Sequence, residues 1–251
     1  MHHQVQAFHL AEANFFNMIS VDRMQTDHIR AFFTGVQSST LNHAVVYHVD
    51  DDFQKSLQSC CDFYANKHVP WEIGVANEDY HALGNILSQH AFVETDTGVA
   101  MALLLQDLKV NPTNVALKMK NMQGALDKWS IPVMLGFEST PERMQPYTDR
   151  HQVAVKDNNA IMHFSGFVDN QAICSLTLTF CDNNVRIDDV ATIPQYQRKG
   201  YATQLLLAAL AHAKSLGSQC CFLEASNDGL NVYQNIGFEA LFKNHYYEVA
   251  K

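Results

Sequence analysis

A short basic loop with one glycine precedes a long apolar helix, and its residue types suit anion binding. The loop reads Gln197, Arg198, Lys199, Gly200, Tyr201 and Ala202. The first N–H groups of a helix have no partner inside the helix, and the positive end of the helix dipole lies there. Gly200 and the small Ala202 let a ligand approach the backbone, while Arg198 and Lys199 add positive charge. The pattern predicts a site suited to a diphosphate.

Two longer stretches around this loop resemble the signatures of a known family. Residues 190–205 resemble the acyl-CoA signature of the GNAT superfamily of N-acyltransferases. Further on, a strand ends at residues 224–227, and residues 231–238 resemble the second signature of that family, an Asn followed by Tyr-x-x-x-Gly-Phe. The resemblance covers about residues 150–250. It implies an α/β (α+β) GNAT fold, a mixed and mostly antiparallel sheet flanked by helices, with acetyl-CoA as cosubstrate.

The resemblance also implies where the cosubstrate lies. The strand before the loop is expected to splay away from the next strand, so that pantetheine pairs with the backbone of Val190, Ala191 and Thr192. The diphosphate is expected on the amides of residues 197–202, and Asn227 is expected to contact the pantetheine arm.

The resemblance assigns two catalytic tasks. Tyr233 is expected to act as the general acid that protonates the departing thiolate. The amide of Val190 or Thr192 is expected to stabilise the oxyanion of the tetrahedral intermediate.

The general base is not assigned. Many relatives carry a Glu on the strand before the loop, whereas the nearest acids here are Asp188 and Asp189. Arg186 stands at the register where some relatives carry their base. Either aspartate could relay a proton through water, or a neutral amine could need no base, so both alternatives stay open.

The order of expected elements is similar in the two halves of the chain. In the first half, helices are predicted at 8–18, 53–64 and 80–90, and strands at 44–49, 71–75, 92–93 and 99–105. In the second half, helices are predicted at 124–129, 138–149, 201–216 and 229–235, and strands at 114–119, 160–168, 172–180, 185–193, 219–225, 239–242 and 246–249. Residues 87–94 also parallel residues 233–239, since a helix is followed by Ala91-Phe92 in one and by Gly237-Phe238 in the other. We therefore expect two GNAT-like units in tandem.

We place the boundary between the units at residues 110 and 111. Residues 1–110 are predicted to form a degenerate GNAT-like domain, and residues 111–251 the GNAT N-acetyltransferase domain. In the first unit Asp50-Asp51-Asp52 takes the place of the diphosphate loop, and three carboxylates would repel a diphosphate. This half is expected to bind no CoA, and instead to line the acceptor cleft or to form a homodimer.

Composition narrows the classes of partner. The formal net charge is −9, which disfavours nucleic-acid binding because such binding needs clustered cations. No stretch is long and apolar enough to predict a membrane span, and no secretory signal is visible at the start. The six cysteines form neither a disulfide framework nor a C-x-x-C motif, so we predict reduced thiols, a cytoplasmic location and no metal site.

Together these observations predict an acetyltransferase. The expected reaction is direct attack of a primary amine, from a small molecule or a protein, on acetyl-CoA. A noncatalytic module that binds acyl-CoA or another protein is the alternative, and a longer acyl donor is not excluded. The acidic charge balance favours a cationic acceptor.

Overall fold

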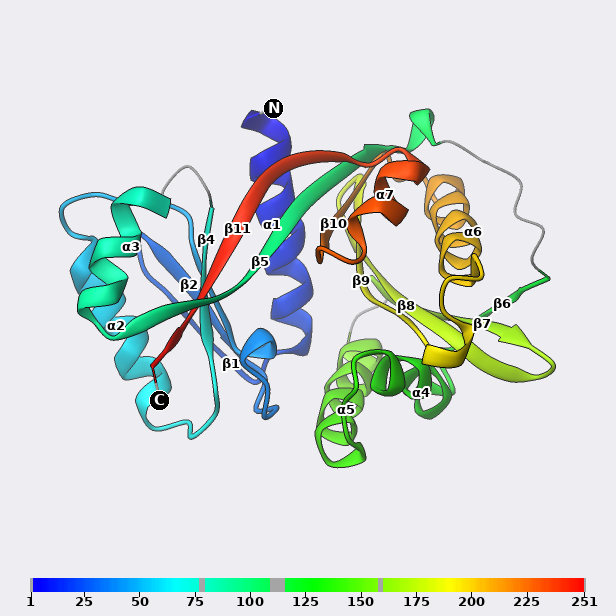
Figure 1. Cartoon of the computed structure of the whole chain (residues 1–251), viewed down its shortest axis with the longest axis horizontal. Helices are drawn as coiled ribbons and strands as arrows, with labels where there is room; N and C mark the ends of the chain where they lie inside the picture. The colour runs from blue at the N-terminus through cyan, green and yellow to red at the C-terminus, as the bar shows by residue number, and fades with distance from the viewer. Residues whose placement is uncertain (1, 77–79, 109–115, 158–159, 251) are drawn as a thin grey trace.

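The computed structural model describes residues 2–76, 80–108, 116–157 and 160–250, which are built around a single sheet (Figure 1). Eleven strands of these residues follow the order β1-β2-β3-β4-β11-β5-β10-β9-β8-β7-β6. Their bounds are β1 Asp22–Gln25, β2 Ile29–Phe33, β3 His43–Val46, β4 Glu72–Ala76, β5 Phe92–Leu104, β6 Lys118–Asn121, β7 Ile161–Val168, β8 Gln171–Cys181, β9 Asn184–Thr192, β10 Cys220–Ala225 and β11 Glu239–Val249. Most neighbouring strands are antiparallel, and the exceptions are β3 with β4 and β9 with β10. The mixed, mostly antiparallel sheet predicted from the sequence is therefore confirmed.

Helices cover both faces of this sheet. Their bounds are α1 His2–Ile19, α2 Phe53–Ala65, α3 Tyr80–Gln89, α4 Leu126–Gly136, α5 Pro141–Asp157, α6 Tyr201–Ser215 and α7 Leu230–Ile236. The apolar faces of α6 and α7 pack on one side of the second half, and α1, α4 and α5 share a separate core. The helices α2 and α3 cover the first half in the same way (Figure 1).

Two long strands in the middle of the sheet, β5 and β11, exchange partners between the halves. They pair with each other antiparallel, from Phe92 opposite Val249 to Ala102 opposite Glu239. Residues 99–104 of β5 also pair with β10 of the second half, and residues 244–247 of β11 pair with β4 of the first half. Each half therefore receives one strand from the other, and both strands cross the middle of Figure 1.

The prediction of four separate strands in this region is wrong, because the structure has two long strands there. The sequence predicts separate strands at 92–93 and 99–105, and again at 239–242 and 246–249, but each pair is one continuous strand. The polar run Glu94-Thr95-Asp96 is exposed and resembles a turn in sequence. Its backbone is held by the facing β11, with Glu94 opposite Tyr247 and Asp96 opposite Tyr246. Pairing across the chain thus overrides the local polar pattern.

Several bounds also differ from the prediction. The strands β1 and β2 were not predicted; they are short, and the turn between them is held by Thr26, whose hydroxyl accepts the amide of Ile29. The helix α4 continues through Pro132 to Gly136, and α5 extends to Asp157. The predicted boundary at residues 110 and 111 lies outside the described residues and stays a prediction.

Among the described residues, no helix is both long and apolar enough to cross a membrane. All six cysteines are free thiols. Burial raises the pKa of Cys174 to about 12 and that of Cys220 to about 11. These thiols therefore stay protonated and are poor nucleophiles at neutral pH.

Candidate active site

The strands β9 and β10 separate after a short paired segment, which opens a notch in the sheet. They pair in parallel register from Asn184 opposite Cys220 to Arg186 opposite Phe222. Beyond Arg186 the two strands continue to Thr192 and Ala225 without pairing to each other. A bulge lies in the same part of β9, where Asp189 has a left-handed φ of 58°. The predicted splay of this strand is confirmed, and Val190, Ala191 and Thr192 lie on the part of β9 that no longer pairs with β10.

The predicted diphosphate loop turns sharply into α6. Pro194–Tyr196 form a short 3-10 turn, and Arg198 and Gly200 both have left-handed φ values, 58° and 83°. Gly200 is the N-cap of α6, whose first residue is Tyr201. Arg198 and Lys199 are exposed at the rim.

The loop presents backbone N–H groups. The amide of Gln197 donates to the carbonyl of Pro194, at 3.2 Å, so it is already used. Within the described residues, the amides from Arg198 to Ala202 donate no backbone hydrogen bond. The unpaired amides of this loop therefore begin at Arg198, one residue after the start of the predicted range. Gln197 acts instead through its side chain, which donates to the carbonyl of Thr192 at 3.1 Å.

Tyr233 lies on the short helix α7, on the α6 side of the sheet. It is 9% exposed and packs edge-on against Phe238, with ring centroids 5.9 Å apart. Burial raises the pKa of Tyr233 above its usual value, and the nearby Asp188 and Cys221 raise it further. The phenol is therefore neutral at physiological pH and can donate a proton. Asn227 lies exposed in the segment between β10 and α7.

Two aspartates on β9 occupy the strand next to the notch. Asp188 accepts a hydrogen bond from Nε of Arg186 at 3.0 Å, and burial raises its pKa although Arg186 opposes that shift. Asp189 accepts hydrogen bonds from the hydroxyls of Tyr147 and Thr177, both at 2.7 Å. Burial and the neighbouring Asp188 raise the pKa of Asp189 to about 7. Of the two acids left open by the sequence, Asp189 is the one poised to exchange a proton near neutral pH.

A cavity on the face of the sheet opposite α6 reaches Asp189. Its volume is about 350 Å³. The first half of the chain contributes Val36, Ser38, Thr40 and Leu41, and the second half contributes the α4–α5 turn and Tyr147. Asp189 is therefore accessible from a pocket that both halves build.

A second, smaller cavity lies at the carboxyl end of β10. Its volume is about 210 Å³, and it shares Thr40 with the larger cavity. Acidic side chains predominate among its charged groups, which are Glu12, Glu72, Asp96, Glu224, Arg186 and His43. We call these two cavities together the acceptor-side cleft, after the role that we propose for them.

The charged groups of the smaller cavity come from both halves. Burial opposes ionisation of Glu12, but a hydrogen bond from His9 and the charge of Arg186 lower its pKa to about 2. Glu224 accepts hydrogen bonds from the Tyr246 hydroxyl and, at 2.7 Å, from the Asn244 amide, while burial raises its pKa. Sequence reasoning missed Glu12 and Glu224. Both could have been found from the sequence, because Glu12 lies among apolar residues of a helix and Glu224 among apolar residues of a strand.

The comparisons with known proteins agree with this geometry. The model of the acetyltransferase (GNAT) family matches residues 127–238. A GCN5-related N-acetyltransferase from Kribbella flavida has a TM-score of 0.70 at 16% identity, covering 98% of this chain and 96% of that one. No curated protein matches the chain by sequence.

Two further solved structures have a similar fold. A GCN5-related N-acetyltransferase from Sphaerobacter thermophilus has a TM-score of 0.67 at 13% identity, covering 89% of this chain and 78% of that one. A tandem GNAT protein from the clavulanic acid biosynthesis pathway has a TM-score of 0.62 at 12% identity, covering 96% and 88%. The matched segment holds the notch, the loop and Tyr233, and the fold matches span nearly the whole chain. Residues 127–238 of this chain therefore match the acetyltransferase (GNAT) family, and nearly the whole chain has the fold of GNAT proteins, including a tandem GNAT protein.

Proposed function

We propose that this protein is an N-acetyltransferase that moves the acetyl group of acetyl-CoA to a primary amine by direct attack. The observation that carries the proposal is the notch between β9 and β10. An amide-presenting loop stands at one end of the notch, and the acceptor-side cleft lies on the other face of the sheet. A thioester carrier could enter from one side and an amine from the other.

The residues around the notch fit acetyl-CoA as a substrate. The amides from Arg198 to Ala202 suit the diphosphate, and the exposed Arg198 and Lys199 add positive charge. Two buried polar atoms beside this path, Oγ1 of Thr192 and Oε1 of Gln204, have no hydrogen-bond partner in the described part of the chain. Buried polar groups normally have partners, so a ligand or water is the expected partner here.

The reaction needs one proton acceptor and one proton donor. The amine nitrogen attacks the thioester carbonyl carbon, and the amide of Val190 or Thr192 stabilises the oxyanion that forms. The intermediate then collapses, the carbon–sulfur bond breaks, and the phenol of Tyr233 protonates the thiolate. The products are the acetylated amine and CoA.

Asp189 is the proposed base. It lines the larger cavity of the acceptor-side cleft and has a pKa of about 7, so its ionised form can take the proton that the amine loses. The hydrogen bonds from Tyr147 and Thr177 fix the carboxylate. A group with a pKa near the working pH is well suited to general-base catalysis.

The acceptor-side cleft favours a cationic amine. Glu12, with its pKa of about 2, carries a negative charge inside the smaller cavity, and Glu72 lies there as well. Burial opposes ionisation of Glu224, so a cation bound there would stabilise its charged form. The first half of the chain lines this cleft with residues between Val36 and Leu41.

The test is CoA release measured with a panel of primary amines, together with calorimetric titration of acetyl-CoA. The proposal expects that acetyl-CoA binds and that an added amine causes release of CoA. An alcohol in place of the amine, or an acetic ester in place of acetyl-CoA, should give no acetyl transfer. Binding without release by any amine would instead support a noncatalytic acyl-CoA-binding module. Absence of binding at millimolar acetyl-CoA would contradict both.

A further inference from the structure

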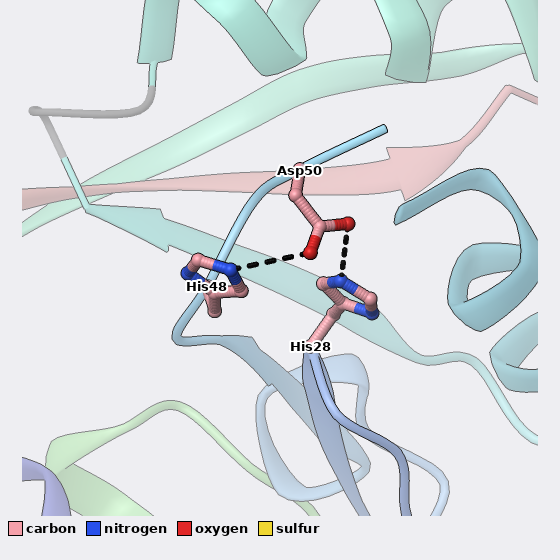
Figure 2. A group of neighbouring side chains, drawn as sticks. All are labelled: His28, His48 and Asp50. Atoms are coloured by element: carbon pink, nitrogen blue, oxygen red, sulfur yellow. Dashed lines mark hydrogen bonds and ion pairs between the residues drawn. The ribbon is translucent and has the colours of Figure 1, made fainter. Parts of the chain in front are cut away.

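Two histidines and an aspartate meet at one end of β2 and β3 in the first half, away from the groups used for acetyl transfer (Figure 2). His28 lies directly before β2, His48 follows β3, and Asp50 lies in the segment that leads into α2. Nε2 of His28 is 2.7 Å from Oδ1 of Asp50, and Nε2 of His48 is 3.3 Å from Oδ2 of the same carboxylate. One nitrogen from each ring and one carboxylate oxygen all lie within 4.8 Å of one another.

The surrounding structure holds these three side chains in place. His28 is buried, and its Nδ1 is 2.8 Å from Oγ of Ser56. Oδ1 of Asp50 accepts the backbone N–H of Asp52 at 2.8 Å. The ring of His48 stacks on that of His28, with centroids 5.6 Å apart and an angle of 10° between the planes. The three side chains are therefore arranged before any ligand arrives.

We propose that His28, His48 and Asp50 bind a divalent transition-metal ion of the Zn²⁺ class. Two imidazole nitrogens and one carboxylate oxygen are a donor set that zinc accepts, with water in the fourth, solvent-facing position. Tetrahedral zinc with bonds of about 2.0–2.1 Å separates its ligand atoms by about 3.3 Å. Nε2 of His48 and Oδ2 of Asp50, 3.3 Å apart, already have this spacing. The 2.7 Å contact of His28 is with the other oxygen, Oδ1, so the half-exposed carboxylate of Asp50 must rotate for one oxygen to serve both histidines.

The second contact of His28 supports this assignment. A metal ligand must offer the lone pair of Nε2, so the imidazole proton must reside on Nδ1, where it can be donated to Ser56.

The place of the cluster in the fold also favours a cation. The segment between β3 and α2 corresponds to the diphosphate loop between β9 and α6, because each joins the first strand of a parallel pair to the next helix. The exposed Asp51 and Asp52 follow Asp50 in the chain. Nζ of Lys55 lies 2.6 Å from Oδ1 of Asp52 and forms an ion pair with it. Carboxylates at this position attract cations, whereas the second half attracts a diphosphate.

The experiment is a zinc titration of the full chain after treatment with EDTA and dialysis. Calorimetry is expected to show one zinc ion bound per chain and no comparable binding of Mg²⁺. Cobalt(II) should give visible d–d absorption bands at the same stoichiometry. His48→Ala and Asp50→Asn should each weaken zinc binding ~10-fold or more, since each removes one of three ligands.

The control is His90→Ala, which removes another exposed histidine of the first half and should leave zinc affinity unchanged. His28 is not substituted, because it is buried and hydrogen-bonded to Ser56. Circular dichroism in EDTA confirms that each variant is folded. The proposal is overturned if the parent chain takes up no zinc, if both ligand variants bind like the parent, or if His90→Ala weakens binding equally. Acetyl-CoA titration is a separate readout, so the outcome does not depend on the proposed transferase activity.

Discussion

The two halves of the molecule differ most clearly where their helices α3 and α7 end. In the second half Tyr233 is followed, four residues on, by Gly237 with a φ of 116° and then by the buried Phe238. In the first half the same spacing runs from Leu87 to Ala91, with a φ of 62°, and then to the buried Phe92. The backbone turn and the apolar anchor are shared, but the phenol is replaced by a fully buried leucine. In the proposed mechanism, this one side chain separates the half that donates the proton from the half that lacks a donor at this position.

The two halves also differ in what lies against their parallel strand pairs. In the first half, β3 and β4 pair from His43 opposite Glu72 to Val45 opposite Gly74. The rings of His43 and Tyr246 lie so close to Gly74 that a Cβ there would come within 2.9 Å of each. Tyr246 belongs to β11, the strand that crosses over from the second half. The exchanged strand therefore places the ring of Tyr246 against the paired segment of β3 and β4.

The largest expected effect comes from Tyr233→Phe. If Tyr233 is the general acid, the variant should lower kcat by about 10²–10⁴-fold, because proton transfer to the thiolate is lost. The affinity for acetyl-CoA, measured by calorimetry, should stay within about twofold, since the ring still fills its apolar site. Leu87→Phe is the matched change in the first half and should leave kcat unchanged. An unaltered kcat in Tyr233→Phe would remove Tyr233 from the mechanism.

The next effect is expected for Asp189→Asn. The rate of the parent protein should rise with pH through about 7, where the Asp188–Asp189 pair loses a proton, because only the ionised base accepts a proton from the amine. In the variant this limb of the pH–rate profile should be absent, and kcat should be about 10²-fold lower. Asp188→Asn should retain the limb but shift it to lower pH, because the charge of Asp188 raises the pKa of Asp189. A parent profile that is flat between pH 6 and 8 would contradict a base with this pKa.

The same variant tests a change in stability. The pKa of Asp189 in the folded state, about 7, is above its ordinary value of 3.8, so the folded protein holds a proton that the unfolded chain releases. The free energy of unfolding should therefore fall as pH rises from about 4 to 7. In Asp189→Asn that fall should be smaller, as measured by urea unfolding at several pH values. An equal fall in both proteins would show that other groups cause it.

A smaller effect is expected for Gly200→Ala. A residue with a Cβ adopts the left-handed φ of 83° only at a free-energy cost of about 1–2 kcal/mol. The loop that presents the amides should therefore shift in the variant. The affinity for acetyl-CoA should fall about tenfold, which corresponds to about 1.4 kcal/mol. Gly217→Ala is the control, because Gly217 also has a left-handed φ, of 96°, but ends α6 far along the chain from the loop. Both variants should lose similar stability, and equal loss of affinity in both would refute a specific role for Gly200.

The sequence predicted the parts of this site that depend on local chain geometry. The loop from 197 to 202, the strand before it and the helix after it follow from glycine, proline and apolar spacing, and they occur where expected. The exchange of β5 and β11 depends on pairing between residues more than a hundred positions apart, such as Thr97 with His245, and local patterns carry no such information. The same limit applies to the acceptor-side cleft, where Glu12 and Glu224 meet through folding. It applies as well to the cluster of His28, His48 and Asp50, which contradicts the sequence-based expectation of no metal site if the zinc proposal holds.

The smallest expected effect separates two reasons why the first half would not bind CoA. Repulsion by Asp51 and Asp52 predicts that Asp51→Asn with Asp52→Asn would admit a second CoA, whereas a filled notch predicts no change. Because His43 and Tyr246 occupy the space beside Gly74, we expect calorimetry to give one CoA per chain both before and after the double substitution. Arg198→Ala with Lys199→Ala is the matched change in the second half and should weaken the one site. A second equivalent bound by the double asparagine variant would show that charge alone distinguishes the halves.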